Sequence, residues 1–235
     1  MTKANSPKPE APKPDSLEQN VGSWLVRSLI LLAIVLIIGH LQGKRPEFLT
    51  FEGSGRGADA PLVKQGGDPY VRALMRTISA SESNVRNPYG VMYGGTYAQS
   101  LNEHPDRCIT IVNGPNIGNC TTAAGRYQFI TTTWQEKARR YHPAPDGFFM
   151  WQNYSFEPQY QDEVVYRWLS DSQAWGVDIP QLLRKGQVDR VLKILSPTWT
   201  SLGYGIETNS MSDALPRIYQ RVLQQELKQG KQSSF

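Results

Sequence analysis

The sequence predicts an α+β fold, in which a mostly helical domain with a small antiparallel β-sheet follows a single N-terminal transmembrane helix. Three observations lead to this prediction. An apolar run near the N-terminus has about the length of one membrane span. Apolar residues then recur at helical spacing in several segments from residue 68 onward. Between these segments, residues 91–112 contain short β-like stretches and a Gly-Gly pair, which is typical of a hairpin.

The first part of the chain is predicted to lie outside the folded domain. Residues 1–22 are rich in Pro and Lys, which is typical of a disordered tail. Residues 23–42 are the predicted anchor, because Trp24–Leu41 is apolar apart from Arg27 and two other polar residues. Two alternatives fit less well. A signal peptide has a basic start and a small-residue cleavage site, and neither is seen. A buried core helix would find no packing partner in its Pro-rich and Gly-rich flanks.

The anchor is followed by a predicted flexible linker at residues 43–67, a folded domain at residues 68–228 and a disordered C-terminus at residues 229–235. Basic residues are nearly balanced on the two sides of the anchor, so charge alone does not decide its orientation. The net charge of +4, from 25 Lys and Arg against 21 Asp and Glu, is spread along the chain. This weak and dispersed charge argues against a nucleic-acid partner.

The folded domain is predicted to begin with a helix that ends near Glu82. Asp68 suits the N-cap position and Pro69 suits the first helical position. The apolar residues of this helix share one face, on which Glu82 also falls, four residues after Ile78. Burial and the negative end of the helix dipole would both raise the pKa of that carboxyl group, as a general acid requires. The simpler alternative is that Glu82 ends the helix half in solvent.

The remaining elements follow from periodicity and turn residues. We expect a hairpin at residues 91–98, a strand at 109–112, and a short strand or helix lead-in at 127–130. A capping box formed by Thr132 and Gln135 predicts the start of the next helix. Further helices are predicted at residues 160–169, 188–195 and 215–223.

Cys108 and Cys120 are the two cysteines of the chain. In an oxidising compartment they would form a disulfide worth about 3 kcal/mol on a chain-entropy model. The alternative is two unrelated buried thiols. With three histidines and no ligand pair at zinc-binding spacing, no metal site is expected.

Several polar and aromatic clusters occur in an order that is specific as a set. They are Ser81-Glu82-Ser83, the Tyr-rich and Gly-rich stretch from Tyr89 to Pro105, Ala124-Gly125-Arg126-Tyr127-Gln128, Gln161-Asp162, and Trp199 to Gly205. In these motifs the chain resembles the lambda-phage endolysin family, which are lysozyme-like peptidoglycan lytic transglycosylases. The resemblance covers about residues 70–226. The chain departs from the family pattern at Ser83, which replaces a glycine, in the longer loop that carries the cysteines, and in the close spacing of Leu202 and Gly203-Tyr204-Gly205.

The resemblance implies a lysozyme-like fold and cleavage of the β-1,4 bond between N-acetylmuramic acid and N-acetylglucosamine. Glu82 would act first as general acid and then as general base, leaving a 1,6-anhydro sugar without any cofactor. The residues implied to contact the glycan strand are Ser81, Tyr93, Gly125, Tyr127, Gln128 and Tyr204. For Tyr127 and Tyr204, packing in the core with a satisfied hydroxyl is an equally open alternative. His104 is expected to stabilise a loop.

Two other functions remain open from the sequence. A hydrolytic lysozyme would need a second carboxylate, for which Glu103 and Asp106 are the nearby candidates. A non-catalytic wall-binding module is the other, although the presence of Glu82 argues against it. The leading expectation is an enzyme held in the bacterial inner membrane by one span, with its domain on the periplasmic side, where peptidoglycan lies and a disulfide is stable. A partner in the envelope machinery is possible, and the sequence does not reveal which partner recruits or regulates the enzyme.

Overall fold

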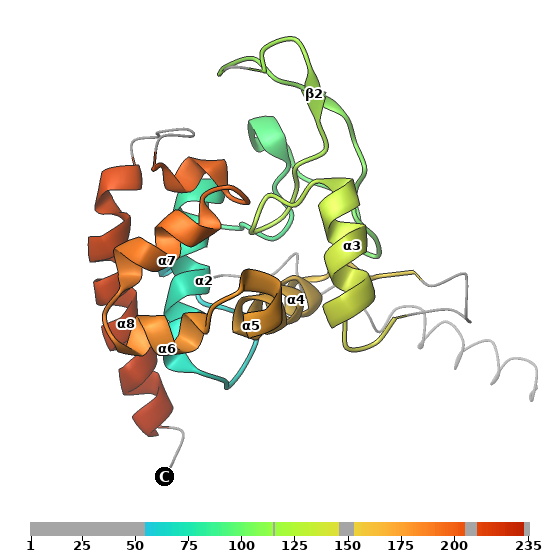
Figure 1. Ribbon diagram of the computed structural model, residues 1–235. Coiled ribbons are helices and arrows are strands. Elements are labelled where there is room, and N and C mark those ends of the chain that lie inside the picture. Colours follow the sequence, from blue (N-terminus) through green and yellow to red (C-terminus); the bar gives the residue numbers. More distant parts are fainter. Residues whose placement is uncertain (1–54, 115, 146–152, 205–210, 233–235) are drawn as a thin grey trace, which may run out of the picture. The chain divides into compact units, whose positions relative to one another are not determined.

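The computed structural model describes residues 55–114, 116–145, 153–204 and 211–232 (Figure 1). The predicted tail, the predicted anchor and most of the predicted linker therefore lie outside the described residues. Within the described ranges, no helix is both long enough and apolar enough to cross a membrane. The described part is rich in helices and contains one two-stranded antiparallel sheet, as the predicted α+β class requires.

Helix α2 (Pro69–Glu82) lies at the centre of the domain, with α7 and α8 on one side and α3 with the β-strands on the other (Figure 1). It begins as predicted, since the Asp68 side chain accepts a hydrogen bond from the Tyr70 N–H at 2.8 Å and Pro69 follows at the first position. The apolar face is fully buried at Val71, Leu74, Met75 and Ile78. This buried face is what fixes α2 in the core and brings its C-terminal end to the cleft described below.

The other long helices also agree with the apolar periodicity. They are α3 (Thr131–Tyr141), α4 (Pro158–Ser170), α7 (Val188–Leu195) and α8 (Leu215–Gln232). Two short helices were not predicted, α5 (Ser172–Trp175) and α6 (Ile179–Arg184), which begin at the side-chain caps Asp171 and Asp178. Four short 3-10 turns complete the set: η2 (Gly57–Asp59), η3 (Tyr93–Gly95), η4 (Thr200–Leu202) and η5 (Ser212–Ala214).

Two boundaries differ from the sequence expectation. The predicted capping box is wrong, because α3 already begins at Thr131 and its N-cap, Ile130, makes no side-chain hydrogen bond. The C-terminal segment predicted to be disordered from residue 229 continues α8 as far as Gln232. Residues 127–130 lead into α3, which is the second of the two predicted alternatives, and Phe129 there makes an isolated bridge to Ala124.

The sheet consists of β1 (Ile109–Thr110) and β2 (Cys120–Thr121), which pair Ile109 with Thr121 and Thr110 with Cys120. The predicted disulfide between Cys108 and Cys120 is present, with the two Cα atoms 5.5 Å apart. We call residues 108–121 the hairpin. The other predicted hairpin, at residues 91–98, reverses direction through η3 and keeps only a single bridge between Val91 and Tyr97.

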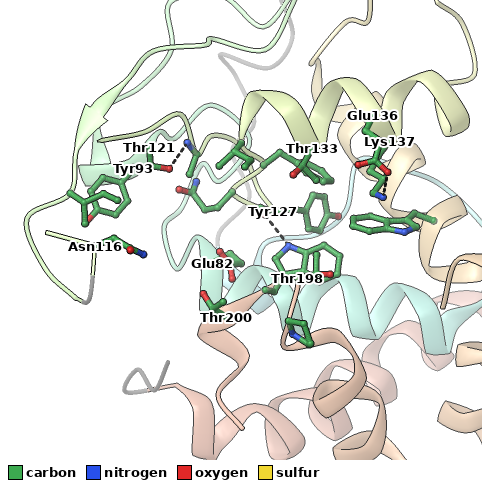
Figure 2. Close-up of a pocket in the computed structure, with 18 of the residues that line it drawn as sticks. Glu82, Tyr93, Asn116, Thr121, Tyr127, Thr133, Glu136, Lys137, Thr198 and Thr200 are labelled. Atoms are coloured by element: carbon green, nitrogen blue, oxygen red, sulfur yellow. Dashed lines mark hydrogen bonds and ion pairs between the residues drawn. The ribbon is translucent and has the colours of Figure 1, made fainter. Parts of the chain in front are cut away.

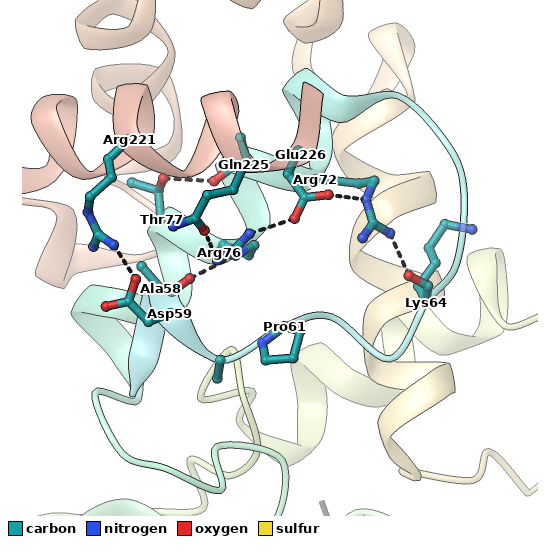
Figure 3. Close-up of polar contacts among 12 residues, drawn as sticks. Ala58, Asp59, Pro61, Lys64, Arg72, Arg76, Thr77, Arg221, Gln225 and Glu226 are labelled. Carbon is teal, nitrogen blue, oxygen red and sulfur yellow. Dashed lines mark hydrogen bonds and ion pairs between the residues drawn. The ribbon is translucent and has the colours of Figure 1, made fainter. Parts of the chain in front are cut away.

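Residues 57–64, which we call the strap, belong to the folded domain and not to a flexible linker as predicted. Ala58, Ala60 and Leu62 are buried. The carbonyl oxygen of Ala58 accepts from Arg76 Nε at 2.7 Å, and that of Ala60 accepts from Arg126 Nη2 at 2.7 Å. The linker prediction therefore fails for these residues, because their backbone carbonyls satisfy buried arginines of the core (Figure 3).

A buried ion-pair network joins α2 to α8 (Figure 3). The Glu226 carboxylate pairs with Arg72 at 2.6 Å and with Arg76 at 2.8 Å, and its side chain is 2% exposed. Burial lowers the pKa of Arg76, while the hydrogen bond that Arg76 donates to Glu226 opposes that change. Removing one member of such a network leaves an uncompensated charge inside the protein.

Asp162 on α4 organises the chain on the other side of α2. Its buried carboxylate accepts from the hydroxyl of Tyr89 at 2.7 Å, from the hydroxyl of Tyr127 at 2.6 Å and from the backbone N–H of Val63 at 2.8 Å. Burial raises the pKa of both tyrosines, and the carboxylate beside them adds to the increase. These bonds connect the strap, α4 and the loop that carries Tyr127.

Candidate active site

A cleft of about 690 Å³ opens between α3, the hairpin and residues 197–200, and the carboxyl group of Glu82 lies at its middle (Figure 2). One end is lined by Tyr93 and by hairpin residues such as Asn116. The other end is lined by Lys137 of α3, and Trp168 lines the cleft beside it, with the Lys137 ammonium group over its ring. A long substrate lying in this cleft would therefore pass over Glu82 with contacts on both sides.

Glu82 is the last residue of α2 and its side chain is half-buried. The hydroxyl of Ser201, in η4, donates a hydrogen bond to Glu82 Oε1. The same hydroxyl lies 3.1 Å from Ser81 Oγ. The apolar periodicity of α2 thus brings one carboxyl group to the cleft surface.

The residue after Glu82 explains one departure from the family pattern. Ser83 has φ −144°, an extended conformation that does not require glycine. Its hydroxyl donates to the backbone oxygen of Arg126 at 2.7 Å, and its N–H donates to the carbonyl of Ser79 at 2.9 Å. Ser83 therefore ends α2 and fastens Glu82 to the loop opposite.

Three of the predicted glycan-contacting residues line the cleft, namely Tyr93, Tyr127 and Gln128. Tyr127 borders the cleft but is 0% exposed, and its hydroxyl donates to Asp162. Gln128 has φ 46°, and its side-chain nitrogen donates to the carbonyl of Gly125 at 2.9 Å. The alternative of core packing with a satisfied hydroxyl therefore describes Tyr127.

The other three predicted contact residues do not line this cleft. The hydroxyl of Ser81 donates to the carbonyl of Ile78 at 3.1 Å. Gly125 has φ 76°, and a Cβ atom there would lie 2.3 Å from the side-chain oxygen of Gln161, so its need for glycine is structural. Tyr204 is exposed and donates to Asp189 Oδ1 at 3.2 Å. Partial burial, with Asp189 beside it, raises the pKa of Tyr204 to about 12.

Sequence reasoning missed the aromatic end of the cleft. The rings of Trp168 and Trp175 stack with centroids 5.0 Å apart, and Trp199 lies 5.3 Å from Trp168. The ammonium group of Lys137 lies 4.5 Å above the Trp168 ring. Trp199 belongs to one of the family motifs, so the sequence could have pointed to it. Nothing in the helical pattern marks Lys137.

The two carboxylates considered as partners of Glu82 lie elsewhere. Glu103 and Asp106 line a second, smaller cavity of about 300 Å³ on another face of α3. Asp106 accepts from the hydroxyl of Thr131 at 2.6 Å. Among the described residues that line the main cleft, the carboxylates are Glu82 and Glu136, and Glu136 pairs with Lys137 at 2.6 Å near the Trp168 end.

His104 stabilises a loop, as expected. Its Nε2 donates to the carbonyl of Phe129 at 2.7 Å, and its Nδ1 accepts from the backbone N–H of Asp106 at 3.1 Å. Burial lowers the pKa of His104, and the Phe129 carbonyl and Asp106 partly oppose that change. In the described ranges, no group of three His, Cys, Asp or Glu side chains is placed to hold a metal ion.

The cleft with its central carboxyl group defines a glycosidase-like site, and the family comparison agrees. The model of the Endolysin family matches residues 72–225, more than half of the chain, so this chain belongs to the Endolysin family. It is a lysozyme-like enzyme that cleaves peptidoglycan. No curated protein matches the chain.

Two solved structures resemble the chain. One is bacteriophage lambda lysozyme complexed with a chitohexasaccharide, with 20% identity and a TM-score of 0.48 over 68% of this chain and 97% of that chain. The other is lysozyme from bacteriophage lambda, with 18% identity and a TM-score of 0.49, again over 68% of this chain and 97% of that chain.

Proposed function

We propose that the chain is a membrane-anchored lytic transglycosylase that cleaves the β-1,4 bond between N-acetylmuramic acid and N-acetylglucosamine. The observation that carries this proposal is that, among the described residues, Glu82 supplies the one carboxyl group at the middle of the cleft. A transglycosylase needs one such group, because the substrate supplies its own nucleophile. A hydrolytic lysozyme needs two carboxyl groups that flank the scissile bond at a defined separation.

Glu82 acts twice in the proposed reaction. The protonated carboxyl group gives its proton to the glycosidic oxygen, and the bond from that oxygen to C1 of the muramic acid breaks. The resulting carboxylate then takes the proton of the C6 hydroxyl as O6 bonds to C1. The products are a 1,6-anhydro end and a free 4-hydroxyl on the leaving sugar, and Glu82 regains its proton. No water, metal or cofactor enters the balance.

The cleft walls suit a glycan strand on both sides of Glu82. Tyr93 and the side-chain amides of Asn113 and Asn116 offer hydrogen bonds at the hairpin end. Gln128 holds the loop through its nitrogen, and its amide oxygen is the atom proposed to accept from a sugar hydroxyl or acetamido group. The face of Trp168 offers an apolar surface at the other end.

The hydrolytic alternative is the weaker candidate. Glu103 and Asp106 lie in the second cavity, and Glu136 is paired with Lys137. A non-catalytic wall-binding module would have no need for a carboxyl group fastened by Ser201 in the cleft. The proposed location remains the inner membrane, with the anchor at Trp24–Leu41 and the domain in the periplasm, which the presence of the disulfide supports.

The test is mass spectrometry of the muropeptides that the full-length protein, purified in detergent, releases from isolated peptidoglycan. We expect 1,6-anhydro ends from the natural sequence and a loss of at least a thousandfold in rate for Glu82→Gln, because the amide can neither give nor take the proton. Reducing ends would establish hydrolysis instead. Protease added to spheroplasts should remove the domain if it faces the periplasm, and protection of the domain would contradict that orientation.

A further inference from the structure

Ser201 is the residue in closest polar contact with the proposed catalytic group, although 119 positions separate it from Glu82 along the chain. Its hydroxyl donates to Glu82 Oε1 and lies 3.1 Å from Ser81 Oγ. Its backbone oxygen accepts from the hydroxyl of Ser212 at 3.1 Å, which connects η4 to η5. Ser201 is therefore fixed through its main chain while its hydroxyl faces two oxygen atoms.

The chemistry of a serine hydroxyl gives this arrangement two states. A hydroxyl has one proton to donate and can also accept. When Glu82 is ionised, the Ser201 proton lies toward Oε1, where a charge-assisted hydrogen bond is strongest. When Glu82 is protonated, the Ser201 proton can turn toward Ser81 Oγ, because the Ser81 proton is directed to the carbonyl of Ile78.

We propose that Ser201 is a positioning residue for Glu82, a role that rests on the proposed function. By donating to Oε1, it holds the Glu82 carboxyl group at the cleft in the orientation from which the proton is delivered to the glycosidic bond and the proton of the C6 hydroxyl is later received. By turning its hydroxyl between Oε1 and Ser81, it accommodates both protonation states of Glu82 without exchanging a proton itself.

Several other charged groups near α2 are engaged in contacts of their own. In the cleft, Glu136 pairs with Lys137. On the elements packed against α2, the ion pairs are Asp59 with Arg221, Glu226 with Arg72 and Arg76, Glu163 with Lys64 and Arg167, and Asp68 with Arg184. Asp162 accepts from Tyr89 and Tyr127, and Arg126 donates to carbonyls of the strap. The hydrogen bond from Ser201 is a direct contact by which the fold acts on the Glu82 carboxylate.

The experiment compares Ser201→Ala, which removes the hydroxyl, with Ser201→Thr, which keeps it, in full-length protein in detergent. Ser155→Ala is the matched control, because Ser155 is a buried serine whose hydroxyl accepts from the Glu157 N–H away from the cleft. We expect Ser201→Ala to lower kcat by about tenfold with KM within about twofold, since a hydrogen bond to a charged group is lost. The alkaline limb of its pH–rate profile should move up by about one pH unit, because the carboxylate has lost a donor.

Ser201→Thr and Ser155→Ala should keep the natural pH profile. A natural profile and kcat in Ser201→Ala would overturn the proposal, and so would an equal loss in Ser201→Ala and Ser201→Thr. Failure of the proposed function would be recognised by other results, namely reducing-end products or full activity of Glu82→Gln. The carboxyl ¹³C titration of Glu82, assigned with Glu82→Gln, tests Ser201 independently of turnover: it should shift upward in Ser201→Ala, and an unchanged titration would contradict the inference.

Discussion

Arg126 Nη2 donates to the carbonyl oxygen of Ala60 at 2.7 Å, so that backbone from the strap accepts from a fully buried guanidinium group. The same side chain donates to the carbonyl of Pro61 at 2.8 Å and to the hydroxyl of Tyr89 at 3.1 Å. The segment before α2 is therefore part of the core of the enzyme. Arg126 lies in the Ala-Gly-Arg-Tyr-Gln motif, next to the wall of the cleft, so the strap also supports the site.

Removal of the strap should destabilise the domain strongly. A chain that begins at residue 68 leaves the donors of Arg76 and Arg126 without their backbone acceptors, whereas a chain that begins at residue 55 keeps them. We expect cooperative thermal unfolding from the longer version and little or none from the shorter one, measured by circular dichroism. Within the full chain, Leu62→Ala should cost about 2–5 kcal/mol, and exposed Gln65→Ala should cost almost nothing. Equal stability of the two truncated chains would contradict this account.

The ion-pair network between α2 and α8 gives a second prediction. Glu226→Gln removes a 2% exposed carboxylate and leaves Arg72 and Arg76 as buried cations. We expect the free energy of unfolding to fall by about 3–5 kcal/mol. Asp59→Asn is the matched control, because Asp59 of η2 and its partner Arg221 of α8 are each 48% exposed and should contribute no more than about 1 kcal/mol. Similar losses in both variants, measured by urea unfolding, would argue against burial as the cause.

The disulfide should matter for substrate binding more than for the chemical step. It closes the base of the hairpin, whose residues Asn113 and Asn116 line one end of the cleft at a distance from Glu82 along its length (Figure 2). The double variant Cys108→Ser/Cys120→Ser should raise KM about three- to tenfold with a smaller change in kcat. It should also lose about 3 kcal/mol of stability on a chain-entropy model. Thr110→Ser, on the same hairpin, is the control; a selective fall in kcat would point to a different role.

His104 should make the domain less stable in mild acid. Its pKa in the folded protein lies below the ordinary value of 6.5, so the unfolded chain binds more protons as the pH falls below that value. Stability contributed by the neutral ring is complete above about pH 6.5 and is lost as the pH falls toward the lower folded value. The free energy of unfolding, measured from pH 7.5 to 5, should therefore decline more steeply in the natural sequence than in His104→Gln. Parallel curves would show that His104 does not titrate in this range.

The sequence predicted the helices whose apolar periodicity is long and complete. Asp68, Pro69 and the buried face of α2 were all readable, because capping and helical spacing are local properties. α5 and α6 were not predicted, since four- and six-residue helices are too short to show a period. The strap was mistaken for a linker because its stabilising groups, Arg76 and Arg126, reach its carbonyls from distant parts of the chain.

The candidate site was predicted to a similar extent. The place of Glu82 follows from the face of α2, and Tyr93, Tyr127 and Gln128 follow from the family motifs. Gly125 and Tyr204 share those motifs, but one is needed for backbone packing and the other bonds to Asp189. Ser201 could not be assigned, because only the folding of η4 against the end of α2 brings its hydroxyl to Glu82.

The strap also limits how far the enzyme can reach. Because the chain is built into the domain from Gly57 onward, with the Gly57 N–H bonded to the carbonyl of Val85 at 3.2 Å, at most residues 43–56 separate the predicted anchor from the domain, in place of residues 43–67. At no more than ~3.5 Å per residue, this length spans at most about 50 Å, compared with about 90 Å for the longer linker. An enzyme anchored in this way would cut only the wall layers closest to the membrane, and it would be held to them by a segment that begins just behind its catalytic helix.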